Sequence, residues 1–461
     1  MTALRAGYLP TEIPGPAGHP LLGMAPELRR DVLGTLMDGF RRYGDLVSYR
    51  IGPARGPKAL RRRYVAVYHP DGVHQVLTDR AFGRDGTTFG VLRELIGDGL
   101  LTTDGDVWVR QRRTLQPLFT ARRVRGYREV MAAEAERVVD DVTRHLGNQV
   151  DLHRLMHQYT VRVIGRAVFG DDVEDAIPAL LRVIPRAGTA VIDRAMRVLR
   201  PPLGLPTPAN RRFTAARDEQ YAVVDRILAR RGERPATPPG DGPEPDAPGD
   251  DIVTRLRAAR DPATGAPLSD QEIRDQALVI LLAGHETSAA ALTFTLHLLG
   301  RHPEVQDRVA EAARAPESDE PSRNLLNATL SEGLRLRPPA YMTERRAHAD
   351  TEIGGWFIPR GSMVLVSPWV THRHPEFWPE PDVFRPERFL GPQDRPRYAY
   401  FPFGGGPRHC IGEHFAMLES EVLLRAILSR FRLTAVEEDL RLVPLITMRP
   451  AAGVPVVFGR R

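Results

Sequence analysis

The stretch Phe403-Gly-Gly-Gly-Pro-Arg-His-Cys-Ile-Gly412 decides how this chain is interpreted, because it contains the only cysteine of the 461 residues, Cys410. The thiol lies in a glycine-dense turn directly before an apolar stretch with helical periodicity, residues 415–431. Glycine lets a backbone approach a flat cofactor closely, and amide N–H groups of a turn and a helix start can lower the pKa of a thiol. Arg408 adds a cation beside it. We therefore interpret Cys410 as a thiolate ligand, although a lone cysteine is usually a small buried hydrophobe.

The same loop resembles the heme-binding loop of the cytochrome P450 family, Phe-x-x-Gly-x-Arg-x-Cys-x-Gly. The matching positions are Phe403, Gly406, Arg408, Cys410 and Gly412. The resemblance implies that Cys410 binds the iron of heme b, that Arg408 pairs with a heme propionate and that Phe403 packs under the thiolate. It also implies the P450 fold, which is mainly α-helical with a small β region in a single large domain.

A second motif, Ala-Gly-His-Glu-Thr at residues 283–287, interrupts a long apolar helical stretch. Glycine inside a helix costs about 1 kcal/mol against alanine, and a buried carboxylate is unfavourable unless it has a partner or a task. The motif resembles the Ala-Gly-x-Glu-Thr pattern of P450s. The resemblance places Gly284 beside heme, where the helix widens locally, and assigns Glu286 and Thr287 to proton supply during O2 activation. His285 occupies the variable position, and we give it no catalytic part.

Two further groups of residues resemble P450 partners of the heme propionates. Trp108 and Arg112 match Trp-x-x-x-Arg, whose i,i+4 spacing puts an indole N–H and a guanidinium on one helix face. Arg345 precedes a predicted strand pair around residues 354–359 and resembles another propionate partner. Its neighbour Arg346 could take that role instead.

The sequence also contains several Glu-x-x-Arg pairs, most of which we interpret as solvated surface pairs. Glu332 and Arg335 alone follow an apolar helical face and precede two prolines that end a helix. By resemblance, Arg388 completes a triad with them that braces the cysteine loop. This role is structural.

Helical periodicity prevails from about residue 120 onward, and two short strands are predicted before it, at residues 45–51 and 64–68. Residues 232–251 are so rich in Pro, Gly and Asp that we predict a mobile surface loop. The motifs lie on both sides of this loop, so we treat residues 1–461 as one domain. The predicted helical segments cover residues 126–146, 161–168, 211–230 and 270–300.

Composition and charge argue against a nucleic-acid-binding protein and against a membrane protein. The net charge of +6 comes from arginines interspersed with acidic residues, so we expect solvated surfaces and no nucleic-acid partner. The first 26 residues lack the roughly 7–15 apolar residues of a signal peptide and the roughly 18 of a membrane span. We expect a cytoplasmic protein without a membrane anchor.

The resemblance implies a monooxygenase that inserts one oxygen atom from O2 into a hydrophobic small molecule. The chain shows no flavin or dinucleotide motif and no four-cysteine cluster site, so we expect electrons from an external ferredoxin and ferredoxin reductase. Arg408 and His409, together with Arg112 and Arg113, would then form a basic docking face for an acidic ferredoxin. Similarity to actinobacterial P450s makes hydroxylation of a secondary metabolite, such as a terpenoid, the first expectation for the substrate. We expect the substrate pocket over the heme to be lined by residues 83–101, 201–206, 339–343 and 445–448.

Three alternatives stay open at this point. A heme-thiolate enzyme can work without external electrons, as a peroxygenase or isomerase, but it would not need the Glu286 and Thr287 pair. A heme sensor or carrier would not need it either. The spacing Asp-Asp-x-x-Asp at residues 171–175 matches a magnesium-binding motif of terpene cyclases, but no companion motif accompanies it.

Overall fold

The structure is a computed structural model of the chain, and it describes residues 13–54, 62–84, 88–195, 201–232, 251–261, 263–392 and 394–461. Most of the loop predicted over residues 232–251 lies outside the described residues. The chain forms two compact units, and each unit combines segments that are distant in the sequence. The first unit comprises Met1–Thr88, Tyr341–Asp382 and Asp394–His409; the second comprises Phe89–Ala340, Val383–Gln393 and Cys410–Arg461.

A five-stranded sheet with the order β1-β2-β8-β5-β3 forms the centre of the first unit. The two strands predicted from the alternating pattern are confirmed as β1 and β2, which pair antiparallel, and β2 runs parallel to β8. Successive side chains of a strand point to opposite faces. Accordingly, Val65 and Val67 of β2 join one apolar cluster and Ala66 joins another, so both faces of the sheet are covered. The strands are β1 (Leu46–Ile51), β2 (Arg62–Val67), β3 (Phe82–Gly83), β5 (Thr343–Ala347) and β8 (Met363–Val366).

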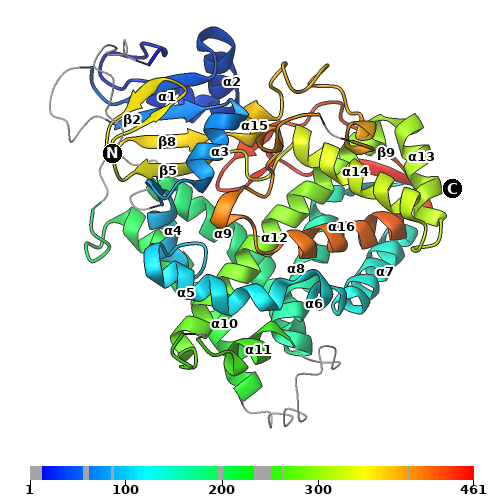
Figure 1. Cartoon of the computed structure of the whole chain (residues 1–461). Coiled ribbons are helices and arrows are strands. Elements are labelled where there is room, and N and C mark those ends of the chain that lie inside the picture. Colours follow the sequence, from blue (N-terminus) through cyan, green and yellow to red (C-terminus); the bar gives the residue numbers. More distant parts are fainter. Residues whose placement is uncertain are drawn as a thin grey trace. The chain divides into compact units, whose positions relative to one another are not determined.

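Short helices and one hairpin complete the first unit (Figure 1). The hairpin of β6 and β7 is the strand pair predicted around residues 354–359. Helix α3 contacts the 3-10 turns η5 and η6, so it supports the chain just before Cys410. These elements are α1 (Ala25–Arg30), α2 (Val32–Tyr43), α3 (Pro70–Thr78), β6 (Thr351–Ile353), β7 (Trp356–Ile358), α15 (Pro368–Thr371), η5 (Arg397–Ala399) and η6 (Gly406–Arg408).

The second unit is mainly helical. All four predicted helical segments are confirmed, as α7, α8, α10 and α12, and the apolar stretch after Cys410 forms α16. Of the helices before residue 120, only α5 was expected, from the Trp108 and Arg112 motif. The others are too short, at 12 residues or fewer, for clear periodicity. The helices are α4 (Thr88–Ile96), α5 (Gly105–Leu115), α6 (Ala121–Arg125), α7 (Arg128–Arg144), α8 (Leu152–Phe169), α9 (Ile177–Ala195), α10 (Pro208–Gly232), α11 (Ile252–Ala258), α12 (Asp270–Arg301), α13 (Pro303–Arg314), α14 (Glu320–Leu336) and α16 (Glu413–Leu428).

Small sheets and 3-10 turns connect these helices. Strands β4, β12 and β9 form one sheet, and β10 pairs with β11 in another. The backbone N–H of Met448 in β11 donates to the carbonyl oxygen of Pro339 at 2.8 Å, so two of the predicted lining segments adjoin. The elements are η2 (Gln116–Phe119), β4 (Gln149–Asp151), η3 (Gly170–Ala176), η4 (Pro386–Phe389), β9 (Phe431–Ala435), β10 (Leu442–Pro444), β11 (Met448–Pro450) and β12 (Pro455–Arg460).

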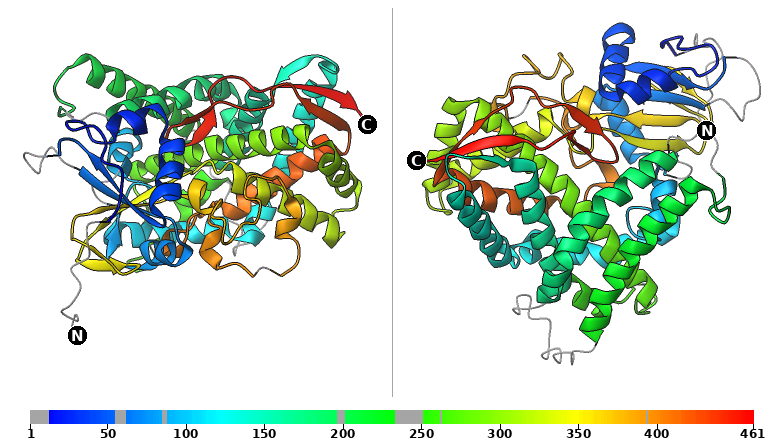
Figure 2. Two further views of the ribbon diagram at one scale, coloured as in Figure 1. Left: turned by 90° about the horizontal axis from the view of Figure 1, so that it is seen from above. Right: turned by 180° about the vertical axis from the view of Figure 1, so that it is seen from behind.

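Helix α12 is the central helix of the second unit, where it packs against α8, α14 and β9 (Figures 1 and 2). Ser269 and Glu272 form a capping box at its start, which satisfies two backbone N–H groups. By length and composition, α12 is the one described helix that could cross a membrane. However, 72% of its apolar window is buried inside the protein, as is typical of a core helix.

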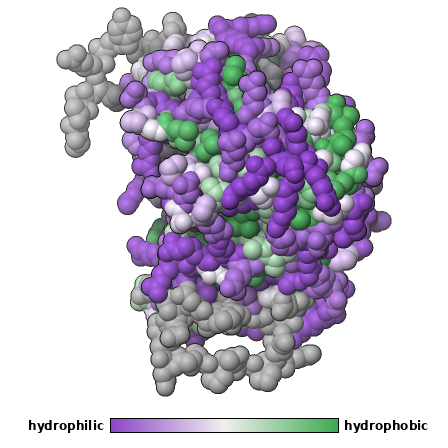
Figure 3. Space-filling model, turned by 90° about the vertical axis from the view of Figure 1, so that its right-hand side faces the viewer, coloured by the Kyte–Doolittle hydropathy of each residue, from purple (hydrophilic) through white to green (hydrophobic). Residues whose placement is uncertain are grey.

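Charged side chains cover much of the surface. Hydrophilic residues dominate the face shown in Figure 3, and apolar residues appear there in smaller groups. Several arginines pair with acidic neighbours, for example Arg301 with Glu438 at 2.9 Å. Such exposed pairs contribute little to stability, and they fit the interpretation of the basic charge as solvated surface.

Candidate functional site

Helix α12 is accessible at one turn near its middle. From residue 275 to residue 299 its side chains are buried, except in the segment Leu282–Thr287, which we call the open turn. Within the open turn Ala283 is exposed, and Gly284, Glu286 and Thr287 are partly exposed. An exposed apolar residue in the middle of a core helix is a surface suited to an apolar or flat ligand. The predicted site residues of this motif therefore lie together at the one accessible part of this stretch.

Glu286 and Thr287 supply the polar chemistry of the open turn. Burial raises the pKa of Glu286 to about 7, and the positive charge of Arg449 opposes that shift. A carboxyl group with a pKa near the working pH can both release and accept a proton. The Thr287 hydroxyl donates to the carbonyl oxygen of Ala283 at 2.5 Å. Gly188 of α9 lies beside this carboxyl group: a Cβ at Gly188 would be 3.8 Å from a Glu286 carboxyl oxygen.

The role expected for Gly284 is corrected by the structure. Helix α12 is continuous from Asp270 to Arg301, so the expected local widening at Gly284 is not present. Instead, a Cβ at Gly284 would lie 3.0 Å from Ile164 of α8. A larger residue here would require the Ile164 side chain to shift, so glycine eases the close approach of α8 and α12.

Sequence reasoning missed a buried carboxyl group on the other side of this turn. Glu419 of α16 is buried, and burial raises its pKa to about 8 while the Ser288 hydroxyl opposes the shift. Neither carboxyl oxygen has a hydrogen-bond partner of good geometry among the described atoms. A protonated carboxyl group thus lies near the residue that follows Thr287. A glutamate in an amphipathic helix carries no sequence signal that distinguishes it from a surface residue.

Cys410 stands directly before α16 in the second unit. The backbone N–H groups of Gly412 and Glu413 donate toward its sulfur, as the glycine turn predicted. Burial nevertheless has the larger effect and raises the pKa of the thiol, which corrects the expected lowering. Cys410 is exposed to solvent, although protein atoms lie close enough to its sulfur to desolvate it. A Cβ at Gly412 would lie 4.0 Å from the sulfur, which leaves that side narrow.

Helix α5 brings Trp108 and Arg112 to one face, as the i,i+4 spacing predicted. Both side chains are partly buried, whereas Arg113 is exposed. Burial lowers the pKa of Arg112, and the Cys410 thiolate opposes that shift. Arg112 is therefore the cation that acts on the thiol within the second unit, a role that the sequence had suggested for Arg408.

The remaining predicted cofactor residues belong to the first unit. Arg345 of β5 is buried, and its guanidinium donates to the Glu344 carbonyl oxygen at 2.8 Å and to the Thr343 hydroxyl at 3.2 Å. Arg346 follows it on the opposite face of the strand and is partly buried.

Phe403 and Arg408, in the turn before Cys410, are partly buried. Gly406 between them has a φ of +64°, and a Cβ there would lie 2.2 Å from the carbonyl oxygen of Leu77 in α3. The close approach to α3 therefore requires glycine at this position.

The triad predicted from Glu-x-x-Arg is present in the second unit. Arg335 and Glu332 have no exposed side-chain surface, and they form two parallel hydrogen bonds of 2.7 and 2.8 Å. The Arg388 guanidinium lies 3.4 Å from the same carboxylate, and the Arg385 backbone N–H donates to it at 2.9 Å. Helix α14, which carries the pair, packs against α16. The triad thus supports the helix that begins just after Cys410.

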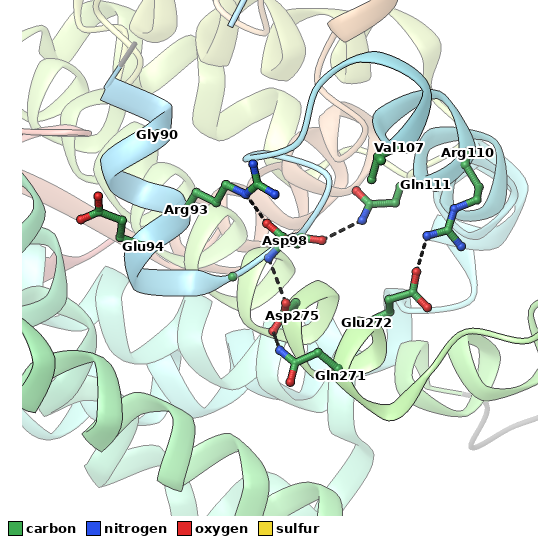
Figure 4. A pocket seen from close by; sticks show the side chains of 11 residues that line it. Gly90, Arg93, Glu94, Asp98, Val107, Arg110, Gln111, Gln271, Glu272 and Asp275 are labelled. Carbon is green, nitrogen blue, oxygen red and sulfur yellow. Dashed lines mark hydrogen bonds and ion pairs between the residues drawn. The ribbon is translucent and has the colours of Figure 1, made fainter. Parts of the chain in front are cut away.

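A recess of about 680 Å³ opens between α4, α5 and the start of α12 (Figure 4). Four of its charged groups pair with one another, Arg93 with Asp98 and Arg110 with Glu272, and Glu94 pairs with Arg194. The carboxylate of Asp275 accepts from the Asp98 backbone N–H at 2.9 Å, although burial raises its pKa. The recess contains none of the predicted site residues, and we assign it no chemistry.

The side chains of Asp171 and Asp172 lie outside the described part of the structure, so the magnesium-binding alternative is not tested at these two positions. No group of three or more His, Cys, Asp or Glu in the described part of the chain could hold a metal ion. Glu174 pairs with Arg166 at 2.8 Å, and Asp175 pairs with Arg230 at 3.2 Å.

The second unit fits a heme group by its own geometry. It presents one solvent-accessible thiol, a Trp and Arg pair on one helix face, and an exposed alanine beside a partly exposed glycine on a core helix. These groups match heme, a flat apolar macrocycle that holds an iron atom and carries anionic propionates. Cys410 would hold the iron, and Trp108 and Arg112 would hold a propionate.

Comparisons with known proteins agree with this geometry. The family model "Cytochrome P450" matches residues 13–453. A cyclooctat-9-en-7-ol 5-monooxygenase of Streptomyces melanosporofaciens is 34% identical over 431 residues, which cover 91% of this chain and 89% of the relative. Pentalenene oxygenase of Streptomyces avermitilis is 32% identical over 460 residues, 97% of this chain and 95% of the relative. The crystal structure of the cytochrome P450DA heme domain superposes with a TM-score of 0.81 at 27% identity and covers 97% of this chain and 98% of that one.

Proposed function

This chain belongs to the cytochrome P450 family of heme-dependent monooxygenases, and we propose that it inserts one oxygen atom from O2 into a terpenoid with electrons from an external ferredoxin and its reductase. The observation that carries the proposal is the open turn of α12. It offers an acid, a hydroxyl and an apolar surface at the accessible centre of a core helix. This combination suits proton supply next to an apolar substrate. A heme carrier or sensor would have no need of such proton supply.

An apolar cluster in the second unit supports the proposed substrate class. One apolar cluster joins α4, α9, α10 and α12 through residues such as Val91, Val191 and Val279. Three of the predicted lining segments contribute to this cluster, through Phe89, Leu203 and Ile446 among others. The two relatives are named for oxidations of cyclooctat-9-en-7-ol and of pentalenene. A compact terpenoid skeleton with few polar groups fits an apolar cluster of this kind, because apolar burial supplies its binding free energy.

Each predicted site residue has a proposed role. Heme b bound through a cysteine thiolate supplies the O2-activating chemistry, since the thiolate increases electron density at the iron. Cys410 provides that thiolate, and Phe403 packs beneath it. Gly284 keeps α12 close to α8, Glu286 holds and releases protons, and Thr287 orders the water that passes them on. We propose Trp108, Arg112, Arg345 and Arg408 as partners of the propionates.

Reconstitution tests the reaction and the substrate class. Purified protein with NAD(P)H alone is expected to be inactive, and a ferredoxin with its reductase is expected to restore turnover of cyclic terpenoids. One labelled oxygen atom from isotopically labelled O2 should appear in the product. Turnover without a partner, or turnover only of polar or charged compounds, would contradict the proposal. Because exposed charges are screened beyond about 8–10 Å, the rate of reduction should fall as salt increases.

The docking of the electron donor depends on the exposed Arg113 of α5. Arg113→Glu is expected to slow the first electron transfer without changing the substrate-binding spectrum, because an acidic partner is repelled while the interior is unaltered. The control is Arg211→Glu, which reverses an equally exposed charge at the start of α10. Stopped-flow reduction measures both variants. Equal slowing in the two variants would show that net charge, and not this face, controls the rate.

Proton supply depends on the Thr287 hydroxyl. Thr287→Ala is expected to leave heme content and substrate binding nearly unchanged but to divert most reducing equivalents into hydrogen peroxide, because general acid–base catalysis contributes about 10²–10⁴-fold. Peroxide and product per NAD(P)H measure the effect. Thr329→Ala is the matched control, since Thr329 also donates to the carbonyl oxygen four residues earlier, in α14, at 2.7 Å. Full product yield in the Thr287 variant would remove this role.

A further inference from the structure

Three histidines form a hydrogen-bonded chain between α8 and α12. His153 and His157 lie one turn apart on α8, and their Nε2 atoms are 3.1 Å apart. His157 Nδ1 lies 2.9 Å from Nε2 of His285 on α12. His285 is fully buried, and the other two are partly buried. The sequence assigned no role to any of them.

Thr293 sets the direction of these hydrogen bonds. Its hydroxyl donates to the carbonyl oxygen of Ala289 at 2.6 Å, so its oxygen must accept from His153 Nδ1, which lies 3.2 Å away. A neutral imidazole has one donor and one acceptor nitrogen. His153 Nε2 therefore accepts from His157 Nε2–H, and His157 Nδ1 accepts from His285 Nε2–H. His285 Nδ1 is left as a buried acceptor without a partner among the described atoms.

The rings stay neutral at ordinary pH, which preserves this direction. Burial lowers the pKa of His153 to about 4, of His157 to about 2 and of His285 to about 3. The positive charge of Arg449 adds to the shift for His153 and His157, and the carboxylate of Asp151 opposes it for His153. A chain of neutral rings with one allowed direction holds each ring in one orientation.

Helix α8 also contacts the backbone of the same residue. The Thr160 hydroxyl lies 3.2 Å from the carbonyl oxygen of His285 and 3.0 Å from that of Met156, so its one proton is shared between the two helices. His285 is thus held by its side chain and by its carbonyl, directly before Glu286. Gly284 on its other side weakens the helix, and the open turn lacks packing on its accessible side. Without an external support, this turn would be the least constrained part of α12.

We propose that His157 is a positioning residue, which fixes His285 and thereby holds the open turn so that Glu286 and Thr287 stay aligned for proton supply. The inference rests on the proposed monooxygenase function. His157 acts through His285 and does not itself contact substrate. Its removal should therefore affect the fate of the electrons more than the binding of the substrate.

The test compares His157→Phe with His157→Gln in the holoenzyme. Phenylalanine keeps a similar shape but breaks both hydrogen bonds, whereas glutamine can accept from His285 through its oxygen and donate to His153 through its amide. We expect about a tenfold rise in the peroxide-to-product ratio for phenylalanine, smaller than the full loss of an acid–base group, and partial recovery for glutamine. The substrate-binding spectrum should not change. His297→Gln is the control, because this buried histidine of α12 bonds elsewhere, to the Glu437 carbonyl oxygen at 2.9 Å.

A second measurement does not depend on activity. Nitrogen NMR of histidine rings in the diamagnetic ferrous carbon monoxide complex should show His153 protonated on Nδ1, and His157 and His285 protonated on Nε2. His157→Phe should change the His285 signals. A wild-type peroxide-to-product ratio in His157→Phe, or the opposite tautomers, would overturn the inference. If the wild-type enzyme itself hydroxylates no terpenoid, the proposed function fails. The tautomers then still decide whether the three histidines form the hydrogen-bonded chain.

Discussion

Replacing Cys410 by serine is expected to abolish the thiolate signature of the heme. In the reduced carbon monoxide complex, the strongly red-shifted Soret band that thiolate ligation produces should disappear, because a serine hydroxyl cannot supply the same electron density to the iron. Cys410 is the only cysteine, so no neighbouring thiol can substitute. The same variant should lose all O2-dependent turnover.

The matched control for this experiment is Glu413→Gln. Glu413 lies three residues after Cys410, and its carboxylate adds to the raised pKa of the thiol. The glutamine variant keeps the sulfur and the α16 start, so it should retain the red-shifted band. An unchanged band in Cys410→Ser would show that another group ligates the iron, and it would remove the central claim.

Replacing Arg335 by leucine is expected to destabilise the protein by about 3–5 kcal/mol, because it leaves the carboxylate of Glu332 buried without its bidentate partner. Glu332 has no exposed surface, and Arg388 at 3.4 Å cannot replace the two shorter bonds. Denaturant unfolding with the midpoint and slope determined together measures the change. Because total stability is typically about 5–15 kcal/mol, we expect much of the variant to be recovered unfolded and without heme.

Two further variants separate the buried pair from an ordinary one. Arg144→Leu removes an exposed arginine with the same i,i+3 spacing to Asp141, and it should change stability by less than about 1 kcal/mol. Adding Glu332→Met to Arg335→Leu should recover part of the loss, since the uncompensated charge is then gone. Equal destabilisation by Arg335→Leu and Arg144→Leu would mean that the buried triad contributes no more to the free energy of unfolding than an exposed ion pair.

Much of the candidate site could be predicted because it depends on local spacing. Trp108 and Arg112 share a face since four residues make about one helical turn, and the Gly412 and Glu413 amides face the sulfur since a helix starts there. The Glu332 and Arg335 pair could be chosen among similar pairs only from its apolar context. The structure then showed that it is fully buried.

Other properties depend on contacts between segments that are far apart in the chain. The pKa of Cys410 is raised because surrounding atoms desolvate it, and the local amides that favoured a lowered pKa have the smaller effect. Gly406 is required by the approach of α3, and Gly284 eases the approach of α8, which no motif describes. The loop predicted over residues 232–251 stays a prediction.

The sequence by itself determined the chemistry available to this protein: one thiol, an acid and a hydroxyl in adjacent positions, and arginines at helical spacing. These follow from covalent order and from the 3.6-residue period of the helix, so they can be seen without a fold. Only the tertiary structure decided which groups are buried and what they contact. His157 and His285 are separated by 128 residues, and their hydrogen bond exists because α8 and α12 pack together. Burial likewise raises the pKa of Glu286 to about 7, because desolvation depends on every atom packed around the carboxyl group and not on its neighbours in the sequence.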